Sequence, residues 1–215
     1  MLLLDGNYQW LKESNYLWIL DAGHGGMNEE GHYMTAPAKM HSFPTFTIYE
    51  GVINRAITSL VENQLHALRI DYAVVAHPIE DTPLSIRVSK ADAVYAKDKR
   101  AIYLSIHSNA GGGSGFEIFT SPGQTKSDKV ANVFCSVYEK CFPLYKMRSD
   151  KSDGDADKEA DFYVLRKTDC PSILVENLFF DNLHEAEYLM SGEGQQAIAA
   201  CIIEAIKEVE RLRPI

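Results

Sequence analysis

The hydrophobic positions along the chain follow two periods that alternate from one segment to the next. Short apolar runs bounded by polar residues or glycine are typical of buried strands. One of them alternates apolar and polar residues and predicts a half-exposed strand, Gly115–Thr120. The complete set of predicted strands is Tyr16–Asp21, Tyr72–Ala76, Ala101–Ser108, Gly115–Thr120, Phe162–Leu165 and Ser172–Asn177.

The segments between these runs carry apolar residues three or four positions apart, which predicts helices with one buried face. A helix beginning at Glu50 would bury Val52, Ile53, Ala56, Leu60, Val61 and Leu65. Thr82 is placed to cap a second helix, with Pro83 at its first position. Two further amphipathic helices are predicted over Thr125–Phe142 and Gly194–Leu212.

This alternation of strands and helices predicts an α/β fold with a twisted, mostly parallel (mixed) central sheet and helices on both faces. The 215 residues suit a single domain, residues 1–215, with no second domain appended. Two stretches interrupt the alternation. We expect the long loop Met27–Tyr49 to border a functional site and the acidic stretch Arg148–Asp161 to be a loosely ordered surface segment that resembles a calcium loop only superficially.

Composition excludes several classes of protein. The net charge of −9 argues against a nucleic-acid partner, because phosphate binding needs clustered Lys and Arg. No segment is long enough to cross a membrane, and the N-terminal residues do not read as a signal peptide. Of the four cysteines, Cys135 and Cys201 fall in apolar helical patterns, so we expect core residues rather than disulfides. The oligomeric state is left open.

Chemically capable side chains follow several of the predicted strands. His24 follows the first strand, His107 lies at the end of "YLSIHS", and Glu176 lies at the end of "SILVEN". Glu50 opens the first long helix. Taken singly, each histidine could be a hydrogen-bonded turn residue, and Glu50 could simply interact with the helix dipole. Glu176 is harder to explain this way, because carboxylates are rarely buried without a partner.

Taken together, these groups predict a metal site, because ligands gather at the carboxyl ends of parallel strands. Two neutral imidazoles and one carboxylate form a three-ligand set for Zn²⁺, with a fourth position for water. The remaining carboxylate would then be the general base. The other histidines are weaker candidates and are expected to be structural or to face solvent: His32, His41, His66, His77 and His184.

With these groups identified, the chain resembles the zinc-dependent N-acetylmuramoyl-L-alanine amidases of the amidase type 3 family. The motifs that carry the resemblance are "ILDAGHGG", "EGVINRAI", "LSIHSNA", "YVLRKTDCPSILVENLFFDN" and "EAEYLMSGEGQQAIAACIIEAI", in order over residues 18 to 207. The resemblance implies one zinc ion held by His24, Glu50 and His107, with Glu176 as the catalytic carboxylate. It implies hydrolysis of the amide between N-acetylmuramic acid and L-alanine in peptidoglycan by a metal-activated water.

The chain departs from the commonest pattern of that family. Cellular members usually carry glycine two residues after the catalytic glutamate, where this chain has Leu178, and Asp181 precedes Asn182. This version is more similar to phage lysins. It implies an endolysin or prophage enzyme that is made in the cytoplasm and reaches the wall after release, or by some other means of export.

Three further residues are candidates for supporting roles. Asp21 is a candidate partner for a metal-bound imidazole. Asn109 would orient the His107 loop or contact substrate, or serve only as a turn residue. Arg166 would meet acids of the stem peptide, although an exposed ion pair is the simpler reading. Two rival functions stay open: a zinc carboxypeptidase-like enzyme acting on stem peptides, and a non-catalytic wall-binding domain on the same scaffold.

Overall fold

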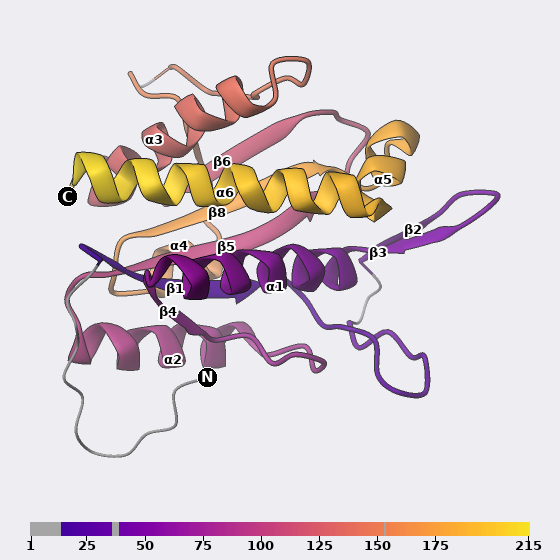
Figure 1. Ribbon diagram of the computed structural model, residues 1–215, viewed down its shortest axis with the longest axis horizontal. Helices are drawn as coiled ribbons and strands as arrows, with labels where there is room; N and C mark the ends of the chain where they lie inside the picture. The colour runs from indigo at the N-terminus through magenta and orange to yellow at the C-terminus, as the bar shows by residue number, and fades with distance from the viewer. Residues whose placement is uncertain (1–13, 36–38, 153) are drawn as a thin grey trace.

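A six-stranded mixed sheet forms the centre of the computed structural model, which describes residues 14–35, 39–152 and 154–215 (Figure 1). The strand order is β4-β1-β5-β8-β6-β7. β6 is antiparallel to β8, and the other neighbouring pairs are parallel. The strands are β1 Leu17–Ala22, β4 Asp71–Val74, β5 Ala101–Asn109, β6 Phe116–Thr120, β7 Lys158–Glu159 and β8 Ser172–Phe179.

Helices cover both faces of this sheet. One face carries α1 Glu50–Leu68, α3 Lys126–Cys141, α5 Leu183–Met190 and α6 Gly192–Leu212. The other carries α2 Leu84–Lys97 and the short α4 Tyr163–Lys167. In β1, Trp18 packs with the first set and Ile19 with the second, as expected of a strand buried on both sides. The predicted α/β class, with its mostly parallel sheet between helices, is confirmed.

Two of the predicted strands need correction. The run Phe162–Leu165 is not a strand: α4 begins at Tyr163, and Val164 and Leu165 pack toward α2. Four apolar residues fit one helical turn as well as a strand, so their pattern could not decide between them. The Gly115–Thr120 strand is present as β6, but it is buried rather than half-exposed, because Glu117 is itself buried and pairs with cations.

The helix starts differ in detail from the expectation. Pro83, not Thr82, is the N-cap residue of α2, and the Thr82 hydroxyl instead accepts a hydrogen bond from the His77 N–H at 2.8 Å. The buried stripe of α1 includes Ile53, Val61 and Leu65 as predicted. Ile57 is also buried, whereas Val52, Ala56 and Leu60 are only partly covered.

The two irregular stretches contain more structure than expected. The loop Met27–Tyr49, outside residues 36–38, contains a hairpin of β2 Met40–Ser42 and β3 Thr47–Tyr49. The stretch Arg148–Asp161, outside residue 153, contains β7 and the buried Asp157, so part of it is packed onto the sheet. The expectation that there is no signal peptide concerns residues 1–13, which lie outside the described residues.

The residue in the position of the family's usual glycine has a left-handed backbone. Leu178 has φ 62° and its side chain is fully buried. The register between β5 and β8 shifts here, since His107 pairs with Glu176 but Asn109 pairs with Phe179. The extra residue on β8 is a bulge, and a left-handed residue is a common component of one.

All four cysteines are free; three are buried and Cys141 is exposed. Among the described residues, no helix combines the length and apolar character needed to span a membrane.

Candidate functional site

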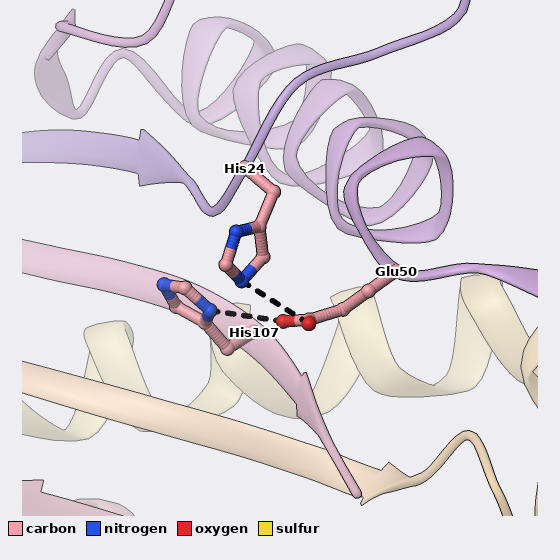
Figure 2. Close-up of side chains that lie close together, drawn as sticks. All are labelled: His24, Glu50 and His107. Atoms are coloured by element: carbon pink, nitrogen blue, oxygen red, sulfur yellow. Dashed lines mark hydrogen bonds and ion pairs between the residues drawn. The ribbon is translucent and has the colours of Figure 1, made fainter. Parts of the chain in front are cut away.

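Three of the predicted residues converge at the carboxyl edge of the sheet (Figure 2). His24 Nε2 lies 3.1 Å from Glu50 Oε2, and His107 Nδ1 lies 3.0 Å from Glu50 Oε1. The two imidazole rings meet edge to face with their centroids 5.1 Å apart. One donor atom from each residue lies within 4.8 Å of the other two, and no other group of at least three His, Cys, Asp or Glu among the described residues meets this criterion.

The backbone of His24 is held in an unusual conformation. β1 ends at Ala22, and His24 two residues later has φ 63°, a left-handed value that residues other than glycine seldom adopt. Its carbonyl oxygen accepts hydrogen bonds from Arg55 Nη2 at 2.6 Å and from Arg87 Nη2 at 2.9 Å. The next N–H, that of Gly25, donates to the Thr35 hydroxyl at 2.7 Å. These contacts fix the turn from which the imidazole projects.

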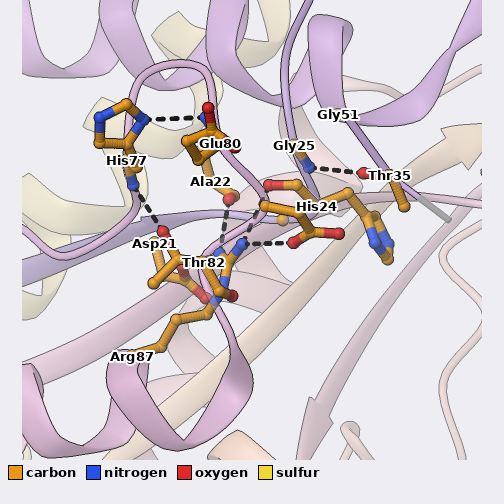
Figure 3. A network of polar contacts seen from close by, with 12 residues as sticks. Asp21, Ala22, His24, Gly25, Thr35, Gly51, His77, Glu80, Thr82 and Arg87 are labelled. Atoms are coloured by element: carbon orange, nitrogen blue, oxygen red, sulfur yellow. Dashed lines mark hydrogen bonds and ion pairs between the residues drawn. The ribbon is translucent and has the colours of Figure 1, made fainter. Parts of the chain in front are cut away.

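Arg87 connects this turn to the sheet (Figure 3). Its guanidinium is buried, donates to the Ala22 carbonyl at 2.7 Å, and forms an ion pair with Asp21. Asp21 also accepts from the hydroxyls of Tyr103 and Ser105, at 2.5 and 2.9 Å. The structure therefore links Asp21 to His24 through Arg87, whereas the sequence suggested a direct contact with the ring.

Glu50 is positioned by the start of α1. It is the first residue of the helix, directly after β3, and its backbone N–H donates to the Lys39 carbonyl at 2.9 Å. The following residue, Gly51, packs against the His24 turn: a Cβ there would lie 2.0 Å from the Gly25 carbonyl oxygen. Only glycine lets the start of the helix approach the turn this closely, which brings the Glu50 carboxylate between the two imidazoles.

His107 and Glu176 are direct neighbours on adjacent strands. They pair in register across β5 and β8, so their side chains lie on the same face of the sheet. β8 continues for three residues past Glu176, so this residue lies within the strand rather than at its end. Its Oε2 atom is buried without a hydrogen-bond partner among the described residues.

The titration behaviour of these groups follows from burial and their mutual contacts. Burial raises the pKa of Glu176 to about 8; the charges of Glu50 and Glu117 add to this effect and that of His107 opposes it. Burial would also raise the pKa of Glu50, but hydrogen bonds from His107 and His24 outweigh it and hold the pKa at about 2. For His107, burial lowers the pKa, but the hydrogen bond to Glu50 and nearby carboxylates produce a net rise. Within one site, the contacts with the imidazoles thus lower the pKa of Glu50, while burial raises that of Glu176.

A cavity of about 740 Å³ opens over these residues. His24, Glu50, His107 and Glu176 line it, together with the first residues of α2 and α4. Lys39, from the loop before β2, also lines it. The prediction that the Met27–Tyr49 loop borders the site is confirmed, since Met34, Thr35 and Lys39 are lining residues.

The remaining sequence candidates lie at different distances from this cavity. Asn109 lines it, but its carboxamide donates to Glu117 and accepts from the Ala110 N–H, which favours a role in holding its own loop. Arg166 is not a lining residue; it forms an exposed ion pair with Asp161 at 2.5 Å. The other histidines described do not join the His24 group; His77, for example, accepts backbone hydrogen bonds in a turn.

Sequence reasoning missed the two arginines that hold the His24 turn. Arg87 carries a detectable signal, because a charged residue in an amphipathic helix that faces the core must have a buried partner. Arg55 lies at the border of the buried stripe of α1 and carries no such signal.

Comparison with known proteins gives a consistent family. The sequence profile of N-acetylmuramoyl-L-alanine amidase (Amidase_3) matches residues 19–208. The chain is 39% identical over 97 residues to the N-acetylmuramoyl-L-alanine amidase CwlM of Bacillus licheniformis, covering 45% of this chain and 36% of that one. It is 27% identical over 202 residues to the endolysin of Bacillus phage SPP1, covering 93% of this chain and 68% of that one.

The fold has solved relatives as well. The crystal structure of the N-acetylmuramoyl-L-alanine amidase from Clostridium difficile 630 superposes with a TM-score of 0.73 at 22% identity, covering 91% of this chain and 97% of that one. At this identity the superposition shows that the two chains share a fold.

Proposed function

Because the chain belongs to the N-acetylmuramoyl-L-alanine amidase family, we propose that it hydrolyses the amide bond between N-acetylmuramic acid and L-alanine in bacterial peptidoglycan. The proposal takes residues 1–215 as a single catalytic domain, with the resemblance to the family over about residues 18 to 207. The observation that carries the proposed activity is the convergence of His24, Glu50 and His107 beside Glu176. The match to CwlM spans only about a third of that protein, so the activity is argued from this chain's own site.

The donor set fits one zinc ion. Four ligands at about 2.0–2.2 Å from Zn²⁺ in a tetrahedron lie roughly 3.3 Å from one another. His24 Nε2 and His107 Nδ1 lie 3.1 and 3.0 Å from the two different carboxylate oxygens of Glu50, and one donor atom from each residue lies within 4.8 Å of the other two. Two imidazole nitrogens and a buried carboxylate, with room in the cavity for a fourth ligand, are the composition of a catalytic rather than a structural zinc site.

His24, Glu50 and His107 would hold the ion in the proposed enzyme. When bound, zinc supplies Lewis-acid chemistry that lowers the pKa of a coordinated water and polarises the scissile carbonyl. The ionised Glu50 and the two imidazoles leave one net positive charge on a divalent ion, so the donor set does not quench its electrophilic character.

Glu176 would move the proton. Its carboxylate accepts a proton from the attacking water and returns it to the nitrogen of the leaving L-alanine, so that the carbon–nitrogen bond breaks to give a carboxylic acid and an amine. The nearby cation favours ionisation of Glu176, in opposition to the burial that raises its pKa. The in-register neighbour His107 keeps this carboxylate beside the metal site.

The two rival functions receive less support. An arginine deep in the cavity that recognises a terminal carboxylate would support a carboxypeptidase, and the described arginine that lines the cavity, Arg87, is buried and engaged by Asp21. A binding domain without activity has no use for a carboxylate with an unpartnered oxygen next to two imidazoles, because burying such a group costs stability.

The proposal also includes how the enzyme reaches the cell wall. The long match to the SPP1 endolysin supports a lysis enzyme that acts on the wall after release from the cytoplasm.

Mass spectrometry of digested sacculi tests the proposed reaction. Purified peptidoglycan incubated with the protein should release intact stem peptides with a free N-terminal L-alanine and leave the glycan strands uncut. A chelator should abolish this release and added zinc should restore it. Shortened stem peptides would indicate a carboxypeptidase, and unchanged sacculi with zinc present would indicate a domain without activity.

A further inference from the structure

One wall of the active-site cavity carries an unusual amount of exposed apolar surface. Leu84 at the start of α2 is 53% exposed, and Phe162 and Tyr163 at the start of α4 are 38% and 37% exposed. All three side chains line the same cavity as His24 and Glu176. Large apolar groups that stay exposed inside a cavity mark a surface that a ligand covers.

Each of the two aromatic rings has one ring or cation as a neighbour within the protein. The Phe162 ring packs edge to face against Phe119, with centroids 5.2 Å apart. The Tyr163 ring lies under the Arg166 guanidinium, which is 5.9 Å from its centroid and is itself paired with Asp161. The rings therefore need little further ordering when a ligand arrives, so less conformational entropy is lost on binding.

The charges around the cavity favour different positions for the sugar and the peptide of the proposed substrate. The described lysine and arginine residues that line the cavity are the buried Arg87 and Lys39. The backbone carbonyl of Lys39 accepts a hydrogen bond from the Glu50 N–H, so Lys39 lies beside Glu50. Near the aromatic wall, the acids Asp81 and Asp161 are each paired with an arginine, Arg87 and Arg166. An anionic stem peptide is favoured near Lys39, whereas a neutral sugar suits a wall whose charges are already paired.

We propose that Leu84, Phe162 and Tyr163 form the subsite for the sugar of the substrate, with a pyranose ring of the glycan strand stacked on the aromatic side chains. The C–H groups on one face of an N-acetylated hexosamine are apolar and carry a slight positive charge. They therefore complement the negative face of an aromatic ring. This inference rests on the proposed function, since it assigns one half of that substrate to one wall of the same cavity.

Two substrates that differ only in the sugar test this assignment. One is a disaccharide peptide of N-acetylglucosamine and N-acetylmuramic acid, and the other is the same peptide carrying only the lactyl group. In Tyr163→Ala and Phe162→Ala, KM for the disaccharide peptide should rise about tenfold for each ring lost, with kcat within about twofold of the wild type. KM for the sugar-free substrate should not change. Tyr163→Phe should behave like the wild type, and Leu144→Ala, an exposed apolar change on a residue outside the cavity lining, serves as the matched control.

A binding measurement makes the test independent of catalysis. Titration of the metal-free protein with the disaccharide, followed by NMR, should show saturable binding that Tyr163→Ala weakens about tenfold. Tyr163→Ala removes a ring that is not packed in the core, so it still tests the proposal if Phe162→Ala fails to fold. Failure of the wild type to release stem peptides would count against the proposed function. The titration would still measure whether the aromatic wall of the cavity binds the disaccharide.

Two results would overturn the sugar subsite. An equal rise in KM for the sugar-free substrate would show that the wall receives the peptide instead. Unchanged kinetics and unchanged disaccharide binding in both ring variants would show that the wall contacts neither half of the substrate.

Discussion

Arg55 Nη2 donates a hydrogen bond of 2.6 Å to the carbonyl oxygen of His24, the residue whose left-handed backbone aims an imidazole at Glu50. The same guanidinium also contacts the carbonyls of Gly51 and His77, so it ties α1, the His24 turn and the loop after β4 together. Arg55 thereby positions one residue of the candidate metal site through its backbone.

Arg55→Gln should weaken zinc binding. The shorter, neutral side chain cannot span the three carbonyls, so the His24 turn would sample other conformations; losses of supporting contacts of this kind cost about 10- to 100-fold in metal affinity. Competition with a chromophoric chelator measures the affinity. Arg211→Gln, which breaks only an exposed ion pair on α6, is the control. Equal affinities for the two variants would mean that the turn keeps its shape without Arg55.

Gly51→Ala should disturb the approach of α1 to the His24 turn. Its Cβ would lie 2.0 Å from the Gly25 carbonyl oxygen, and overpacking of this kind costs about 1–3 kcal/mol of folding free energy. The midpoint temperature of thermal unfolding and the affinity for zinc should both be lower than in the wild type. The matched change Gly192→Ala places a Cβ in open space at the start of α6 and should leave both unchanged or raise stability slightly. The close approach would be unimportant if both glycine variants behaved alike.

Glu176→Gln should lose activity and keep zinc. The amide cannot accept a proton from water, and removal of a general base commonly lowers the rate by about 10²–10⁴. Glu176 is not one of the three grouped donors, so metal content by mass spectrometry should match the wild type. Turnover near the wild-type rate would exclude Glu176 as the base.

Asp157 should make stability depend on pH. Burial raises its pKa to about 7, and repulsion from Asp155 and Asp128 adds to the rise, while its hydrogen bond from Thr120 opposes it. Because the folded-state pKa lies above the unfolded value of about 3.9, the folded protein binds the proton more tightly. The stabilising contribution is complete below about pH 4 and is lost as pH rises toward 7, by at most about 1.4 kcal/mol per pH unit.

Asp157→Asn should flatten this dependence. The amide cannot ionise, so the variant should gain stability relative to the wild type as pH increases from 5 to 8. Urea denaturation at a series of pH values measures the two curves. Parallel curves for the two proteins would show that Asp157 has an ordinary pKa.

The sequence predicts that the candidate donors lie close together, and the structure brings His24, Glu50 and His107 into one group. His24 follows a buried run and Glu50 opens an amphipathic helix, so the end of one period and the start of the next mark their positions. His107 and Glu176 lie on parallel strands whose ends share one edge of the sheet. The hydrophobic periodicity and the strand topology together predict that these four residues lie near one another.

Other parts of the site depend on contacts that no local pattern encodes. The turn at His24 is stabilised by Arg55 and Arg87, which come from two different helices. The apolar pattern predicts a strand at the start of α4, because four apolar residues fit either structure, and it does not associate the exposed rings of Phe162 and Tyr163 with the cavity. Long-range hydrogen bonds and the packing of short elements decide these features.

Leu178 adopts a left-handed backbone at the position where the resemblance to the family leads to the expectation of glycine. The bulge in β8 keeps its left-handed residue, while the leucine side chain fills part of the core. The left-handed backbone costs about 1–2 kcal/mol, whereas burial of the leucine side chain contributes about 1.5–3 kcal/mol of stability. A motif search that demands glycine two residues after Glu176 would reject this chain, whereas a search for the bulge geometry would retrieve it.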